Sequence, residues 1–140
     1  MQRGDDVIEN ITALLQADTA LATYIEGRIY MMTAPQNAPE PFVVWQPISN
    51  VAYNSLSDAP DSDQQRIQID VYAADPVIAR EAMWTARNYV ERYHSVIDGP
   101  LAMGRDPDTL LSRYSMDCSV FHRRAPYAPA VAIVSNGVLN

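Results

Sequence analysis

The clearest hydrophobic pattern of the chain lies in residues 66–97, where the period of the apolar positions changes. In 66–73, RIQIDVYA, apolar and polar residues alternate, which predicts a strand with one buried face. In 76–97 apolar residues recur every three or four positions, which predicts a long helix with one apolar stripe. Asp75 and Pro76 between them suit an N-cap and a first helical position. We therefore predict a central strand followed by one long helix.

Similar patterns predict the remaining elements. Residues 5–16 fit an amphipathic helix, and a second short helix follows between an N-cap at Asp18 and a terminating Gly27. The other expected elements are strands at 28–31, 42–46, 101–103 and 111–122, a Pro-rich loop at 33–41 and a turn at 105–108.

The order of these elements predicts an α+β fold, an antiparallel β-sheet with helices packed on one face. The longest polar segment, 50–65, lies between two strands and is expected to be an extended β-hairpin excursion with an acidic tip. Residues 1–122 are expected to form a single domain, followed by a C-terminal extension, 123–140, RRAPYAPAVAIVSNGVLN. A tail this apolar is seldom free in water, so it either folds back on its own domain or docks on another subunit, and we favour docking.

Composition and charge narrow the class of function. The length of 140 residues suits one domain, and 48% hydrophobic with 19% charged residues is a globular composition. The formal net charge of −7 argues against affinity for nucleic acid by phosphate neutralisation, which needs a basic face. No apolar run is long enough to span a bilayer, so we expect no membrane contact and a protein made in a reducing cytoplasm. The single cysteine, Cys118, lies in an alternating apolar segment and is expected to be buried and inert.

The sequence offers no recognisable catalytic or metal-binding motif. His94 and His122 have no partner at the spacing of metal ligands. The acidic run at 58–63 resembles a calcium loop only faintly, because the positions that require Gly and Glu hold other residues, and it leaves at most a weak cation site. Nucleophile elbows and phosphate-binding glycine loops are absent from the sequence. We therefore expect neither enzyme activity nor a cofactor, and a protein that works through contacts.

Two segments of the chain carry a resemblance to a known family. One is the RIQIDVYA strand at 66–73 before its helix, and Asp117 corresponds to an acid in the family's closing strand. The other is the opening segment, where the matching residues are Leu15, Asp18, Leu21, Ile25, Gly27, Arg28, Ile29, Tyr30, Ala34, Pro35, Pro41, Val43 and Gln46. Over about residues 8–122 the chain resembles the tail-terminator, or tail-completion, family of long-tailed bacteriophages and prophages.

The resemblance implies a structural virion protein of the tail or neck. It implies assembly into a ring, expected to be hexameric, that caps the tail tube and joins it to the head. The expected partners are other copies of the chain, the tail tube protein and head connector or neck proteins, while DNA passes through the channel without specific binding. The alternatives are a head-completion or adaptor protein of the neck and, from another class, a small α/β ligand-binding domain or enzyme.

A closed ring requires two different interfacial patches on each subunit. The segments expected to supply them are the polar excursion and the C-terminal extension, with Arg28 and Arg66 as candidate donors of ion pairs. The residues predicted to lie at an interface are Arg28, Tyr53, Asp58, Asp61, Asp63, Arg66, Arg123, Arg124 and Tyr127.

Overall fold

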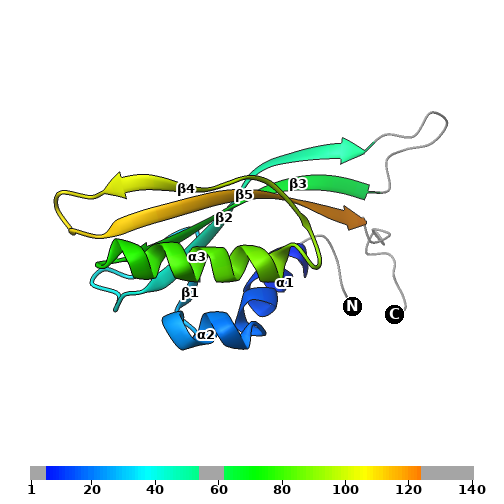
Figure 1. The fold of residues 1–140 in the computed structure, drawn as a ribbon. Coiled ribbons are helices and arrows are strands. Elements are labelled where there is room, and N and C mark those ends of the chain that lie inside the picture. Colours follow the sequence, from blue (N-terminus) through cyan, green and yellow to red (C-terminus); the bar gives the residue numbers. More distant parts are fainter. Residues whose placement is uncertain (1–5, 54–61, 124–140) are drawn as a thin grey trace, which may run out of the picture.

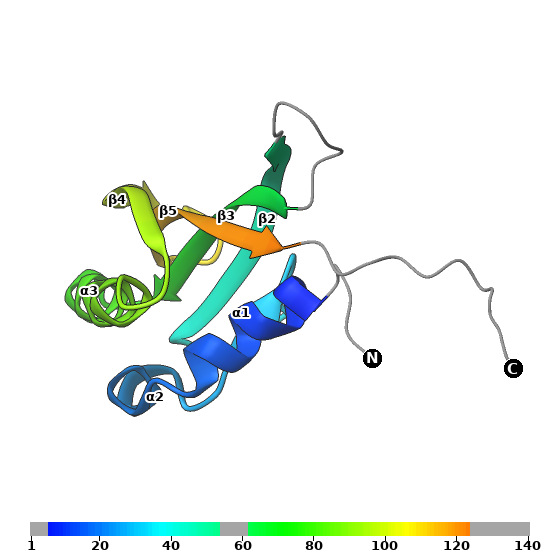
Figure 2. The same cartoon turned by 90° about the vertical axis from the view of Figure 1, so that its right-hand side faces the viewer.

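Five strands form one sheet in the part of the chain that the computed structural model describes, residues 6–53 and 62–123. Their order is β1-β2-β3-β5-β4, and all neighbours pair antiparallel except the parallel pair β1 and β2. The three helices cover one face of this sheet and leave the opposite face, here called the open face, without a helix (Figures 1 and 2). The elements are α1 (Asp6–Gln16), α2 (Thr19–Ile25), β1 (Ile29–Met31), β2 (Phe42–Tyr53), β3 (Ser62–Ala73), α3 (Pro76–Val90), β4 (Ser95–Arg105) and β5 (Ser112–Arg123). The predicted α+β class with helices on one face is confirmed.

Two of the helices have an aspartate as their N-cap. Asp18 accepts hydrogen bonds from two amides in the first turn of α2, both at 3.2 Å. Asp75 accepts from the amide of Val77 at 2.9 Å, and Pro76 occupies the first turn of α3, where no amide partner is needed. Both predicted helix starts are therefore confirmed.

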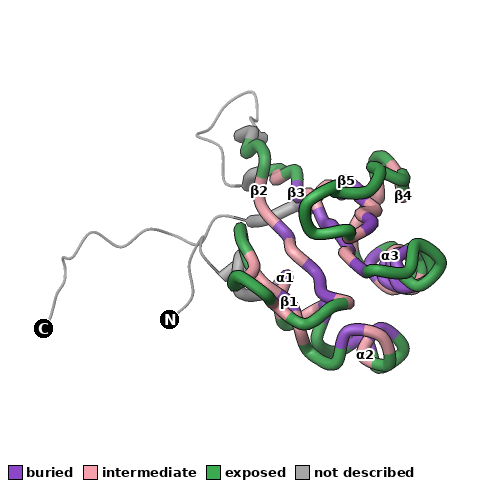
Figure 3. Tube along the Cα trace, turned by 90° about the vertical axis from the view of Figure 1, so that its left-hand side faces the viewer, coloured by how far each residue is buried: buried purple, intermediate pink, exposed green. Residues whose placement is uncertain are grey.

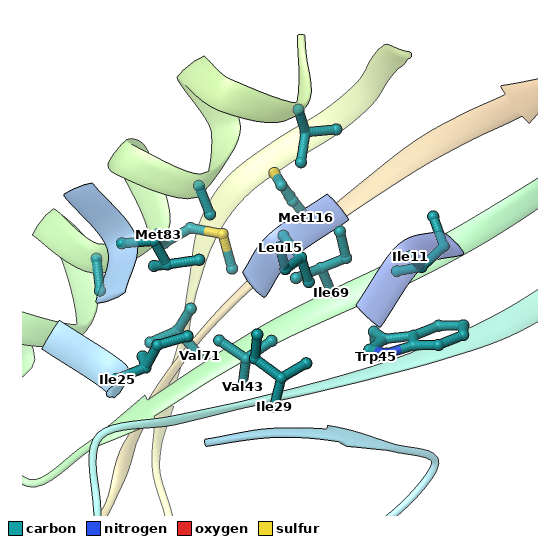
Figure 4. Close-up of a cluster of buried hydrophobic side chains, with 14 of the residues drawn as sticks. Ile11, Leu15, Ile25, Ile29, Val43, Trp45, Ile69, Val71, Met83 and Met116 are labelled. Carbon is teal, nitrogen blue, oxygen red and sulfur yellow. The ribbon is translucent and has the colours of Figure 1, made fainter. Parts of the chain in front are cut away.

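The core lies between the sheet and the helices (Figure 4). The alternating residues Ile67, Ile69 and Val71 of β3 are fully buried against it, as the sequence pattern predicts. The buried stripe of α3 is built mainly from alanines, and small side chains let a helix lie close to a sheet. Trp45 of β2 is the largest of the fully buried side chains and lies beside Ile11 of α1.

The long helix ends earlier than its apolar pattern predicts. α3 stops at Val90, whose carbonyl accepts from the amides of Tyr93 and His94 at 2.9 Å, and the chain then turns into β4. The predicted helix to residue 97 is wrong, because β4 spans Ser95–Arg105. The predicted strand at 101–103 lies within β4, which is longer than the prediction. Val96 keeps the helical spacing but packs on the same core from the strand, so its burial did not require a helix.

Both ends of the polar segment 50–65 are strand. The main chains of Asn50–Tyr53 and Ser62–Gln65 continue the pairing of β2 with β3, so only 54–61 lies outside the described residues. Figure 1 shows the paired ends of β2 and β3 projecting beyond the helices. The predicted extended hairpin is confirmed. Its paired part is longer than the polar sequence indicates, because ladder hydrogen bonds use the main chain and not the side chains.

Candidate assembly surfaces

Several residues predicted at an interface meet at one end of the sheet. Tyr53 pairs with Ser62, and Ser62 pairs with Arg123, so β2, β3 and β5 share this level. Asp63 lies one step along the same ladder. We call residues 51–53, 62–64 and 121–123 the hairpin end. Of the other predicted residues, Asp58, Asp61, Arg124 and Tyr127 lie outside the described residues.

Two ion pairs cross the open face between β3 and β5. Nη2 of Arg66 lies 2.8 Å from Oδ2 of Asp117, and its Nε donates to the same oxygen at 3.2 Å. Nε of Arg113 lies 3.5 Å from Oδ2 of Asp70, whose side chain is only 6% exposed. The two pairs run in opposite directions, with the arginine on β3 in one and on β5 in the other. Arg66 thus already has a partner in its own chain, and its predicted role at an interface stays a prediction.

Arg28 is occupied by contacts near the start of β2. Its Nε donates to the carbonyl of Pro41 at 2.9 Å, and its Nη2 to the carbonyl of Tyr24 at 3.4 Å. Its Nη1 lies 3.4 Å from the carboxylate of Glu26. These contacts hold the loop before β2 against the end of α2. An interfacial role of Arg28 also stays a prediction.

Exposed apolar side chains gather along the two edges of the sheet. β1 pairs with β2 only from Val43 to Trp45, so the part of β2 beyond Trp45 lies at the same edge of the sheet as β1. We define the β1 edge by Met31, Met32 and Ile48, and the β4 edge by Ile97, Leu101 and Met103. Figure 3 shows β4 as exposed or partly exposed along its course. These two edges lie at opposite ends of the strand order.

α3, which contacts β4 as well as β3 and β5, adds an aromatic group to its exposed surface. The indole of Trp84 is 42% exposed, and the guanidinium carbon of Arg87 lies 5.2 Å from its ring centroid. Arg87 also forms an ion pair with Glu91 at 2.7 Å. Trp and Arg are the residues most enriched in energetically dominant interface contacts. Sequence reasoning missed Trp84, although its position off the apolar stripe of the helix is visible in the sequence.

A groove of about 710 Å³ lies on the open face, where the loop 32–38 meets the turn 108–111. Its apolar and aromatic lining includes Phe42, whose ring stacks on that of Tyr72 with centroids 5.1 Å apart. Burial, together with the nearby carboxylate of Asp70, raises the pKa of Tyr72 above its ordinary value. The groove could not be predicted from the sequence, since it combines three segments that are distant along the chain.

The described residues contain no cluster of His, Cys, Asp and Glu that could hold a metal ion. None of the described helices is long and apolar enough to cross a membrane. Burial lowers the pKa of His94, which favours a neutral imidazole.

Cys118 is fully buried, as predicted. Burial raises the pKa of its thiol to about 12, and the adjacent Asp117 carboxylate adds to the rise. At pH 8 the thiolate fraction should therefore be roughly a thousandfold below that of a free cysteine. We expect a disulfide reagent to label the folded chain slower by at least this factor than the chain in urea. Stoichiometric labelling of the folded chain within minutes would contradict this assignment.

Solved structures of other proteins contain this fold. Thirteen chains match, among them one from the virion of a native gene transfer agent particle. That chain has a TM-score of 0.57 and 17% identity, over 79% of this chain and 90% of its own length. The likeness at this identity is one of fold, and the fold is found in a virion.

The family follows from the sequence itself. The family model described as tail completion protein gp17 matches residues 9–123. The chain therefore belongs to this tail completion family, and it is a structural protein of the virion tail or neck. No curated protein matches its sequence. The resemblance drawn from the sequence is confirmed.

Proposed function

We propose that the chain is a tail terminator subunit, of which six copies form a ring that caps the tail tube and joins it to the head or neck. Membership of the tail completion family supports this role. The structural observation that carries it is the presence of two unlike apolar edges on one sheet. A ring of identical subunits closes only through a head-to-tail interface, in which two different patches meet.

In this arrangement the β4 edge and Trp84 of one copy contact the β1 edge of the next. Both surfaces are rich in the residue types that interface cores favour, with Met on both edges and an exposed Trp beside an Arg on α3. A strand at the edge of a sheet also has main-chain N–H and C=O groups that are free to pair with a neighbour. Edge-to-edge contact would therefore extend the sheet from subunit to subunit.

The hairpin end is then available for another virion protein. We propose that Tyr53, Asp63 and Arg123 contact the tail tube or the neck, together with Asp58, Asp61, Arg124 and Tyr127, which are close to them in sequence. The net charge of −7 suits a channel that DNA passes without being held, because like charges repel. Catalysis has no part in this function.

Native mass spectrometry and electron microscopy test the ring directly. We expect hexameric rings that bind tail-tube ends and block further polymerisation. Leu101→Asp damages the β4 edge and Ile48→Asp the β1 edge, since these side chains are 52% and 43% exposed. Each variant alone should be monomeric. Leu110→Asp, 55% exposed but on neither edge, should still form rings.

Mixing the two monomeric variants distinguishes a head-to-tail interface from a symmetric one. The Leu101→Asp chain keeps an intact β1 edge, and the Ile48→Asp chain keeps an intact β4 edge. The mixture should therefore give a heterodimer through its one intact interface, and no ring. Rings that survive both substitutions, or a chain that stays monomeric even with tail tubes present, would contradict the proposal. Binding to the head-side ring instead of the tube would favour the neck-adaptor alternative.

A further inference from the structure

We propose that the groove on the open face binds the apolar part of the C-terminal extension of a neighbouring copy, so that each subunit is strapped to the next. The inference rests on the proposed ring in one respect, since it needs a second copy within reach. Its occupant is defined by sequence as residues 126–134, PYAPAVAIV, which lie outside the described residues.

The chemistry of the groove fits an extended, Pro-containing peptide. Phe42 stacks on Tyr72, and the ring of Tyr30 meets Phe42 edge-on with centroids 5.9 Å apart. Met32 and Pro35 line the groove from the adjacent loop. Grooves lined by aromatic rings bind Pro-rich segments, because such segments are already extended and lose little entropy on docking.

The occupant has the matching composition. Pro126 and Pro129 flank Tyr127, and the five residues from Ala130 to Val134 are all apolar. Contact with water disfavours an apolar run of this kind, and the apolar part of the groove lining, which includes Met32, Phe42 and Leu111, can cover it. Polar side chains at its rim, such as Gln36 and Thr109, can bond to the main chain of a bound peptide.

The length of the extension favours docking in the groove of a neighbouring copy over docking in the groove of its own copy. Tyr72 pairs with Arg113, ten residues before Arg123, so the groove lies about 34 Å from the end of β5 at ~3.4 Å per residue. Ala132, the centre of the apolar run, follows Arg123 by nine residues and reaches at most about 32 Å when fully extended. Reversal of direction after Arg123 shortens this reach further. The apolar run could therefore enter its own groove only with the chain close to full extension, whereas docking in the groove of an adjacent copy carries no such requirement.

Disulfide trapping in the full chain tests the strap. Gln36→Cys places a thiol in the exposed groove wall, and Ala132→Cys places one at the centre of the apolar run. Cys118 is buried and does not compete. On mild oxidation, a mixture of the two variants should give roughly tenfold more covalent dimer than a control mixture, because docking raises the effective concentration of the thiols. The control pairs Ala132→Cys with Thr23→Cys, an exposed position on α2 outside this groove and outside both edges.

The double variant Gln36→Cys/Ala132→Cys separates the possible outcomes. If the C-terminal extension of each copy docks in the groove of the next, we expect a ladder of covalent oligomers up to the size of the ring. A monomer with an internal cross-link would overturn the proposal. Rings seen by native mass spectrometry without cross-links would overturn the strap and leave the ring intact, whereas monomers without cross-links would overturn both.

Discussion

Replacing Gly99 with alanine is expected to destabilise the chain by roughly 3 kcal/mol or more, because strained backbone and a steric clash add together. Gly99 has a φ of +88°, a region that side chains rarely adopt. A Cβ atom there would lie 2.6 Å from the carbonyl oxygen of Ser115 and 2.9 Å from the Cα of Met116. Both atoms belong to the main chain of β5, which is paired on both sides and cannot move away cheaply.

Gly104 provides a matched control for this substitution. It lies in the same strand with a φ of +93°, but a Cβ atom there meets nothing within 4 Å. Gly104→Ala therefore carries only the conformational strain, about 1 kcal/mol. Urea unfolding of the two variants, followed by circular dichroism, measures the difference. Equal losses of stability in both would show that the close approach of β4 to β5 is not what requires glycine at position 99.

Trp45→Ala is expected to cost about 3–5 kcal/mol, the usual range for removing a large aromatic side chain from a core. The side chain is fully buried between the sheet and α1 (Figure 4), and its Nε1 donates to Oγ1 of Thr12 at 2.9 Å. The substitution thus leaves a cavity and also removes a link between β2 and the first helix. We expect unfolding at a much lower urea concentration, with the oligomer lost as a consequence.

Two milder variants separate packing from the hydrogen bond. Thr12→Val removes the acceptor and leaves the indole N–H unpaired, which should cost about 1–3 kcal/mol. Trp45→Phe keeps most of the ring volume and should cost less than Trp45→Ala. If Thr12→Val were as damaging as Trp45→Ala, the hydrogen bond and not the packing of the ring would dominate at this site.

Much of the fold could be predicted from the sequence, because local patterns and caps agree with the tertiary structure. Alternation predicted the part of β3 from Arg66 to Ala73, and the cap at Asp75 predicted the observed start of α3. The end of α3 could not be predicted, since Val96 satisfies a helical period while it packs, partly buried, on the core from a strand. The extent of β2 and β3 was hidden for a related reason, because polar side chains carry no sign of main-chain pairing.

The candidate surfaces were less accessible to sequence reasoning. The proximity of Tyr53 and Arg123 depends on strand register, which determines which residues lie side by side. The ion pair of Arg66 with Asp117 is diagonal across two strands separated by 51 positions, so neither partner indicates the other. The apolar edges could not be predicted either. The sequence does not distinguish exposed from buried apolar residues until the order of the strands in the sheet is known.

The pairing of Ser62 with Arg123 couples two binding steps that could otherwise be independent. One is the binding of another virion protein at the hairpin end, and the other is the docking of the C-terminal extension on the next copy. A virion protein that binds the hairpin end contacts the point from which the C-terminal extension departs. If such a protein steadies this end of the sheet, it favours the strap to the next copy, and a strapped ring binds that protein more tightly by the same factor. The order of assembly would then follow from these affinities alone. The straps would dock weakly in free rings and more tightly in rings that are bound to the partner protein.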